Sequence, residues 1–151
     1  MHRSVHLFTA TMMVLFVITS VGHAERLDGN EPLACVADKG IEYRNPGSSK
    51  DFDPESVGLP ANFIVDFKNK KIEPTKESLV RRTTKIYQTK YIEDKLILQG
   101  ADEGVEGVVD GIGWSMAISK DTGRFVISAS GTSVGYIVFG NCKCVKQNSW
   151  E

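Results

Sequence analysis

No run of apolar residues in this sequence is long enough to cross a lipid bilayer. The longest spans residues 7–18, whereas a membrane-spanning helix needs about 20. This run follows Arg3 and precedes Gly22, His23 and Ala24, which is the order found in a secretory signal peptide. We therefore expect cleavage after Ala24, export of residues 25–151 to the periplasm or beyond, and no membrane span in the mature chain. A lipoprotein anchor is not expected, because the first cysteine is Cys35.

Histidine is scarce, and the three copies, His2, His6 and His23, all lie in the segment that we expect to be removed. Imidazole is the usual general base near neutral pH, the usual activator of Ser and Cys nucleophiles, and the commonest zinc ligand. The mature chain is therefore expected to have no Ser-His-Asp triad, no Cys-His pair and no histidine-based zinc site. The absence of histidine does not exclude carboxylate pairs, lysine chemistry or histidine-free metal sites.

The expected mature chain also lacks an excess of charge of one sign. Its 127 residues carry 17 basic and 19 acidic side chains. A general nucleic-acid binder needs a strongly positive surface, so the near balance of charge excludes that class. The length suits one domain, residues 25–151, with a core of its own.

Alternation of apolar and polar residues is clearest in the last third of the sequence. Trp114, Met116 and Ile118 alternate with small or polar residues, as in a half-buried strand. A turn at residues 120–123, a second alternating run over 125–129 and an apolar run over 134–139 predict a three-stranded meander. Trp114 is predicted to lie in the core, and Trp150 to be exposed or loosely packed.

Further strands are predicted over residues 33–37, 63–67, 80–91 and 96–98. Residues 75–82 are also compatible with a short helix capped by Thr75, and residues 45–54 are typical of an irregular loop. Short strands separated by turns favour an all-β fold, an antiparallel meander that closes into a small barrel or a sandwich.

Only three cysteines are present, Cys35 near the start and Cys142 and Cys144 after the last predicted strand. Export makes oxidation plausible, and a Cys142–Cys144 bridge would close a strained short ring. We expect Cys35 to pair with Cys142, although pairing with Cys144 stays open. The Cys142-Lys143-Cys144 sequence could also form a redox or soft-metal site, but a disulfide partner beside a spare thiol is the preferred interpretation.

Basic residues are concentrated between positions 68 and 95, where the sequence has nine lysines and arginines but four acidic residues. Such a face could bind an anionic envelope component or an acidic protein. The alternative is a solvated outer surface whose charges block pairing between sheet edges. The candidate residues for an anionic partner are Lys68, Lys70, Lys71, Arg81, Arg82 and Lys85.

Four carboxylates, Asp102, Glu103, Glu106 and Asp110, lie in a glycine-rich stretch. Paired carboxylates serve as acid and base in glycoside hydrolysis, or gather on calcium. The spacing here matches no calcium loop, so a soluble loop is the preferred interpretation. We predict no metal site and no cofactor.

Residues 113–118, 122–125 and 135–142 together resemble the C-terminal ends of small exported bacterial proteins of unassigned activity. The resemblance implies a β-meander closed by a cysteine, and it transfers no catalytic residue. In addition, Ser130, Gly131 and Tyr136 resemble the Ser-Gly-x-x-Tyr loop of periplasmic lysozyme inhibitors, although Tyr136 stands at a different distance.

The sequence thus predicts an exported, non-catalytic β-domain with a binding or envelope role. The first alternative is a protein inhibitor of an envelope-attacking hydrolase such as lysozyme, whose exposed loops would plug an active site. The second is an enzyme that works without histidine, such as a carboxylate-based glycosidase.

Overall fold

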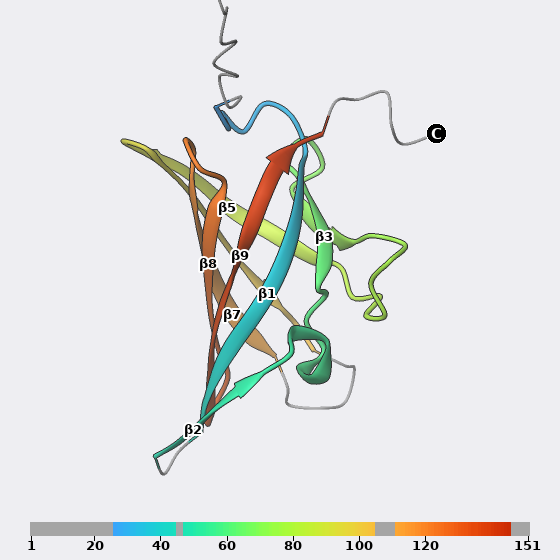
Figure 1. Cartoon of the computed structure of the whole chain (residues 1–151), viewed down its shortest axis with the longest axis vertical. Coiled ribbons are helices and arrows are strands. Elements are labelled where there is room, and N and C mark those ends of the chain that lie inside the picture. Colours follow the sequence, from blue (N-terminus) through green and yellow to red (C-terminus); the bar gives the residue numbers. More distant parts are fainter. Residues whose placement is uncertain (1–25, 45–46, 105–110, 146–151) are drawn as a thin grey trace, which may run out of the picture.

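A computed structural model describes residues 26–44, 47–104 and 111–145 of the chain. Within these ranges the fold is all-β (Figure 1). The elements in chain order are β1 (Leu33–Arg44), β2 (Ser48–Phe52), the 3-10 helix η1 (Pro54–Val57), β3 (Asn62–Asp66), β4 (Lys71–Pro74), β5 (Thr84–Ile92), β6 (Lys95–Asp102), β7 (Ile112–Ser119), β8 (Arg124–Ser130) and β9 (Val134–Cys144). No described helix combines the length and the hydrophobicity that a membrane crossing requires.

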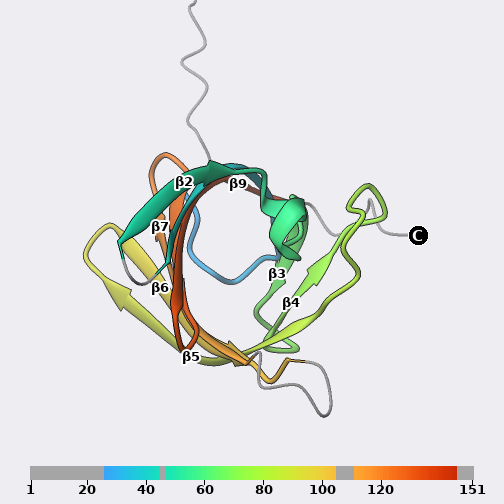
Figure 2. The same ribbon diagram turned by 90° about the horizontal axis from the view of Figure 1, so that it is seen from below.

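Eight antiparallel strands close a barrel, and β2 is an extra strand outside the ring (Figure 2). Each strand from β3 to β8 pairs with the next, and β9 pairs with β1 along the whole of β1, from Leu33↔Cys144 to Arg44↔Val134. The other edge of β1 is shared, because β3 pairs with its first four residues and β2 with its last five. Barrel closure distinguishes this fold from the sandwich that the sequence also allowed.

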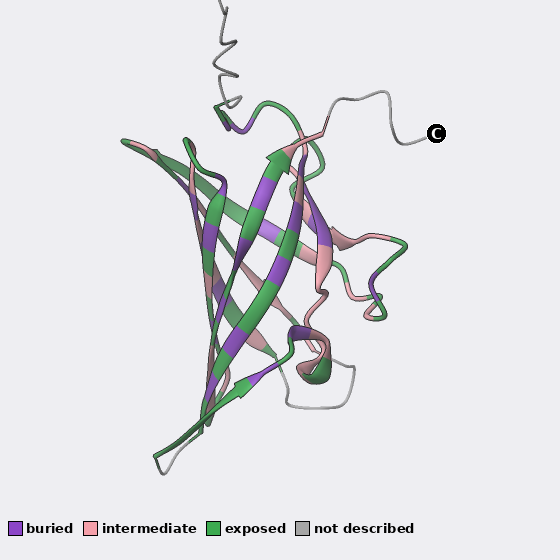
Figure 3. Ribbon diagram, in the orientation of Figure 1, coloured by how far each residue is buried: buried purple, intermediate pink, exposed green. Residues whose placement is uncertain are grey.

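The barrel interior is filled by alternate residues of the strands, which Figure 3 shows as a succession of buried and exposed segments. Residues with the same side-chain direction are two positions apart in a strand, so each strand contributes one apolar face. The fully buried members include Leu33, Val65, Leu96, Leu98, Met116 and Ile118. This alternation confirms the strands predicted at 114–119, 125–129 and 134–139.

The upper end of the barrel in Figure 1 is covered by the segment before β1. Leu27 is 3% exposed and belongs to the core, and its N–H donates to the carbonyl oxygen of Lys120 over 2.9 Å. At the lower end lies η1, which begins at an Asp53 cap and ends at Gly58 in the left-handed region (φ 80°). The two ends are therefore closed by different parts of the chain.

Four sequence predictions are corrected by the structure. Residues 48–52 form β2 rather than loop, because β1 extends to Arg44 and offers an edge for pairing. The strand predicted over 80–91 begins only at Thr84, which pairs with Ile72 of β4, and residues 75–82 do not form the alternative helix. Cys142 and Cys144 lie inside β9 rather than after it.

The proposed signal peptide and Trp150 lie outside the described residues.

Candidate functional site

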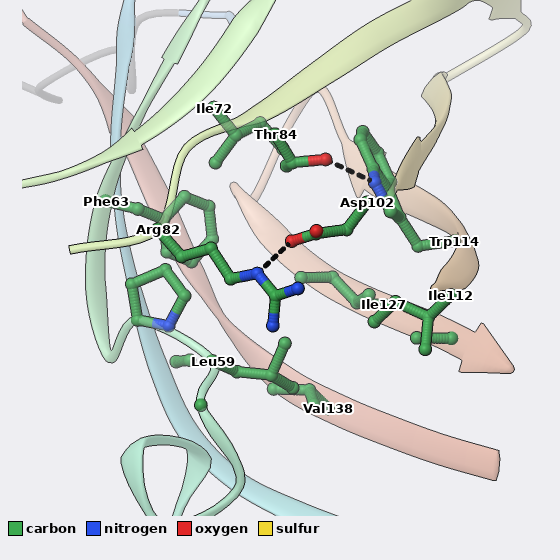
Figure 4. Close-up of a pocket in the computed structure, with 14 residues that line it drawn as sticks. Leu59, Phe63, Ile72, Arg82, Thr84, Asp102, Ile112, Trp114, Ile127 and Val138 are labelled. Carbon is green, nitrogen blue, oxygen red and sulfur yellow. Dashed lines mark hydrogen bonds and ion pairs between the residues drawn. The ribbon is translucent and has the colours of Figure 1, made fainter. Parts of the chain in front are cut away.

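The lower half of the barrel contains an apolar cavity of about 70 Å³ (Figure 4). Its walls come from residues of all eight barrel strands, from Arg82 before β5, and from Gly58, Leu59 and Pro60 after η1. Phe63, Ile72, Trp114 and Val138 are buried, whereas Leu59, Ile112 and Ile127 are half-buried and mark the more open side of the cavity, here called its mouth. The apolar lining consists of Ala37, Leu59, Pro60, Phe63, Ile72, Ile112, Trp114, Ile127, Ala129 and Val138.

Trp114 is held in one position by packing and by a hydrogen-bond chain. Its ring lies against Gly100, where a Cβ atom would stand 2.4 Å from Cζ2 of the indole, so only glycine fits. The indole Nε1–H donates to Oγ1 of Thr84 over 3.0 Å. That hydroxyl donates in turn to the carbonyl oxygen of Ala101 over 3.0 Å. One wall of the cavity is therefore preorganised.

An ion pair between Arg82 and Asp102 lines the cavity. The Nε of Arg82 lies 2.7 Å from Oδ2 of Asp102, and the side chains are 36% and 16% exposed. Oδ1 of Asp102 also accepts the N–H of Gly104 over 2.9 Å, which fixes the carboxylate. Figure 4 shows the guanidinium group of Arg82 extending from this contact toward Leu59 and Ile127. Among the described residues of the wall, the charges of Arg82 and Asp102 offset each other.

The structure divides the predicted basic face. Lys71 pairs with Glu73 (2.6 Å), and Arg82 belongs to the cavity. Arg81 donates to the carbonyl oxygens of Thr75 and Lys76. The remaining candidates, Lys68, Lys70 and Lys85, are exposed and have no ion-pair partner among the described residues.

The predicted carboxylate cluster is only partly described. Asp102 lies at the end of β6 in the cavity wall, and Glu103 beside it is exposed, whereas Glu106 and Asp110 lie outside the described residues. No group of three or more Cys, His, Asp or Glu side chains suited to a metal ion is found in the described part of the chain.

The disulfide prediction is confirmed, since Cys35 and Cys142 are bonded and their Cα atoms lie 4.0 Å apart on β1 and β9. Cys144 stands opposite Leu33 and is half-buried. The strand register explains this choice, because only Cys142 lies directly across from Cys35.

The residues that resemble an inhibitor loop are separated by the fold. Gly131 lies in the turn between β8 and β9, where its N–H donates to the carbonyl oxygen of Val134 over 2.9 Å. Tyr136 lies within β9, and its ring packs edge-on against Phe52 with centroids 5.5 Å apart. Tyr136 therefore packs against the core instead of projecting from a loop.

Glu42 was not singled out by sequence reasoning, yet its side chain is only 2% exposed. It lies on the inward face of β1 and accepts a hydrogen bond from Nε of Arg44. Nζ of Lys50 lies 3.7 Å from Oε1 of Glu42. The hydrogen bond from Arg44 is the main cause that lowers the pKa of Glu42 below its ordinary value of 4.5. A charged residue at an inward-facing strand position was the available signal.

We expect Glu42 to make folding sensitive to acid. Its pKa is lower in the folded state than in the unfolded state, so its contribution to stability is present above about pH 4.5 and is lost as the pH falls through the folded value. Between about pH 6 and pH 3 the urea midpoint should fall more steeply for the native chain than for Glu42→Gln. Parallel pH profiles for the two proteins would contradict this assignment.

Taken together, the fold and the site define a class: a small closed antiparallel barrel with an apolar end cavity. Comparisons of the chain with protein-family models, with curated proteins and with solved structures find no match.

Proposed function

We propose that this chain is an exported, non-catalytic binding protein that takes a small uncharged apolar group into the lower cavity of the barrel. The observation that carries the proposal is an apolar cavity whose polar wall is limited to a neutral ion pair and a hydroxyl group. Eight-stranded barrels of this size are just wide enough to hold side chains or one small ligand. A concave, mostly apolar site with a few fixed polar groups is the usual form of a small-molecule site.

The size of the cavity limits what can enter. Its volume of about 70 Å³ is roughly half that of an engineered cavity of ~150 Å³ that binds benzene. A short alkyl end or the edge of a ring would fill it, and the rest of the ligand would extend through the mouth beside Leu59 and Arg82.

The absence of net charge in the wall favours an uncharged ligand. Asp102 already offsets the charge of Arg82, so a carboxylate or an ammonium group would lose hydration without gaining an uncompensated opposite charge. Export is supported by the N-terminal pattern and by the Cys35–Cys142 disulfide, because such bonds persist in oxidising compartments.

The test uses 1-hexanol as the probe, with hexanoate and hexylammonium as charged analogues of the same chain length. Titration of the isotope-labelled protein should shift the Trp114 indole N–H signal saturably, with a dissociation constant of about 1 mM or tighter for hexanol. Both charged analogues should bind at least about tenfold more weakly, since burial of their charge costs free energy.

A matched pair of variants locates the binding. Ala129 is 5% exposed and lines the cavity, so Ala129→Leu should remove the hexanol response. Ala117→Leu makes the same change on the outer side of β7 and should leave binding as it is. If Ala129→Leu does not fold, Ala37→Val fills the cavity from β1. Equal hexanol binding by a folded cavity-filled variant and by Ala117→Leu would contradict the proposal.

A further inference from the structure

The edge of β5 that faces away from β6 is paired over only part of its length. β4 pairs with β5 at Lys71↔Lys85 and Ile72↔Thr84, and the N–H of Ile86 donates to the carbonyl oxygen of Lys70 over 2.8 Å. Beyond Ile86, Tyr87 lies in a bulge and residues 88–92 continue to pair with β6 on one side. No described strand pairs with them on the other side. A slot for one further strand therefore lies beyond the first residue of β4, Lys71.

The unpaired edge is open to solvent. All six residues from Tyr87 to Ile92 are exposed, and Tyr87, Tyr91 and Ile92 are 60%, 56% and 54% exposed. Figure 3 shows this half of β5 as an exposed ribbon on the arm that leaves the barrel wall. In an antiparallel ladder alternate residues direct their N–H and C=O groups away from the paired neighbour. An open edge of this kind is a template for an extended peptide, which adds to the sheet as a strand.

Positive charge surrounds the slot. Lys68 and Lys70 lie in the turn between β3 and β4, which adjoins the Ile86 end of the slot. Lys85 and Lys90 lie on β5 itself. These four lysines have no ion-pair partner among the described residues.

The carboxylates near the slot offset this charge only in part. Asp94 pairs with Lys95. Asp66 keeps its negative charge, because its hydrogen bonds come from the neutral backbone and side-chain amides of Asn69. Glu93, at the tip of the β5–β6 hairpin, is exposed and also negatively charged. The local charge therefore complements a negatively charged strand.

We propose that the open edge of β5 is a docking site for an acidic, extended segment of a partner protein. The segment would lie in line with β4, pair with Tyr87 to Ile92 through its backbone, and place its carboxylates near Lys68, Lys70, Lys85 and Lys90. This site is separate from the lower cavity and does not depend on what the cavity binds. Backbone pairing would give affinity, and the lysines would select for negative charge.

The probe is a capped ten-residue peptide in which glutamate alternates with valine and threonine. Binding to the full chain in about 0.1 M salt should shift the backbone amide signals of residues 87–92 and slow their hydrogen exchange. A peptide with lysine in place of each glutamate should bind at least about tenfold more weakly. No binding of the acidic peptide, or shifts confined to other strands, would overturn the proposal.

Two further comparisons separate strand addition from simple charge attraction. A probe that carries N-methyl groups at every second residue keeps its charge but loses the donors of one edge, so its affinity should fall at least about tenfold. The triple variant K68E/K70E/K85E should weaken binding by a similar factor, whereas Lys39→Glu on the outer side of β1 should not change it. Unchanged affinity of the N-methylated probe would show that no strand is added.

Discussion

Replacing Cys35 and Cys142 together by serine is expected to lower the free energy of unfolding by about 4 kcal/mol, because the disulfide joins residues 107 positions apart. In the chain-entropy model a cross-link of this length restricts the unfolded chain strongly. The same bond ties β1 to β9, the ladder at which the barrel closes. Urea denaturation under non-reducing conditions measures the difference.

Cys144→Ser is the matched control, since it removes a sulfur from the same strand and leaves the disulfide intact. Its free energy of unfolding should stay within about 1 kcal/mol of the native value. A double variant that loses less than about 1 kcal/mol would show that barrel closure does not depend on the cross-link.

Leu98→Ala is the second substitution with a large expected effect. Leu98 is fully buried on β6 beside Met116 of β7, so removing its side chain leaves a cavity in the core. Truncation of a buried leucine costs about 2–5 kcal/mol, depending on how far the neighbours relax. We expect about 3 kcal/mol, measured by the shift of the urea midpoint at constant slope.

Ile97→Ala tests whether the barrel interior is assigned to the correct side of β6. Ile97 is the next residue along the strand and faces outward, where it is half-buried. Its truncation should cost less than half as much as that of Leu98. An equal or larger loss at Ile97 would mean that the register of β6 is shifted by one residue, since such a shift exchanges the two faces.

The strands that were predictable are those in which one face is apolar throughout. In β7 the alternation of Trp114, Met116 and Ile118 with smaller residues determines both the strand and its inward face. The lower half of β1 lacks this signal, because its inward positions are occupied by Gly40 and Glu42. β2 has one buried residue, Phe52, so its strand depends on pairing with β1 rather than on its own pattern.

The cavity could not be read from the sequence, because its polar pair comes from segments to which other roles were assigned. Arg82 was included in a basic face and Asp102 in a soluble loop. The two residues are 20 positions apart, and the hairpin of β5 and β6 brings them together. The bulge between Ile86 and Gln88 shifts this register by one residue, which counting from the turn at Glu93 would have missed.

Intermolecular nuclear Overhauser effects in the presence of 1-hexanol are the most direct test of the proposed ligand site. The alkyl protons should contact the indole ring of Trp114 and the methyl groups of Ile127 and Val138, which line the lower cavity. Contacts confined to Ile41, Ile137 and Phe139, which are exposed on the outer side of the barrel, would contradict binding inside it.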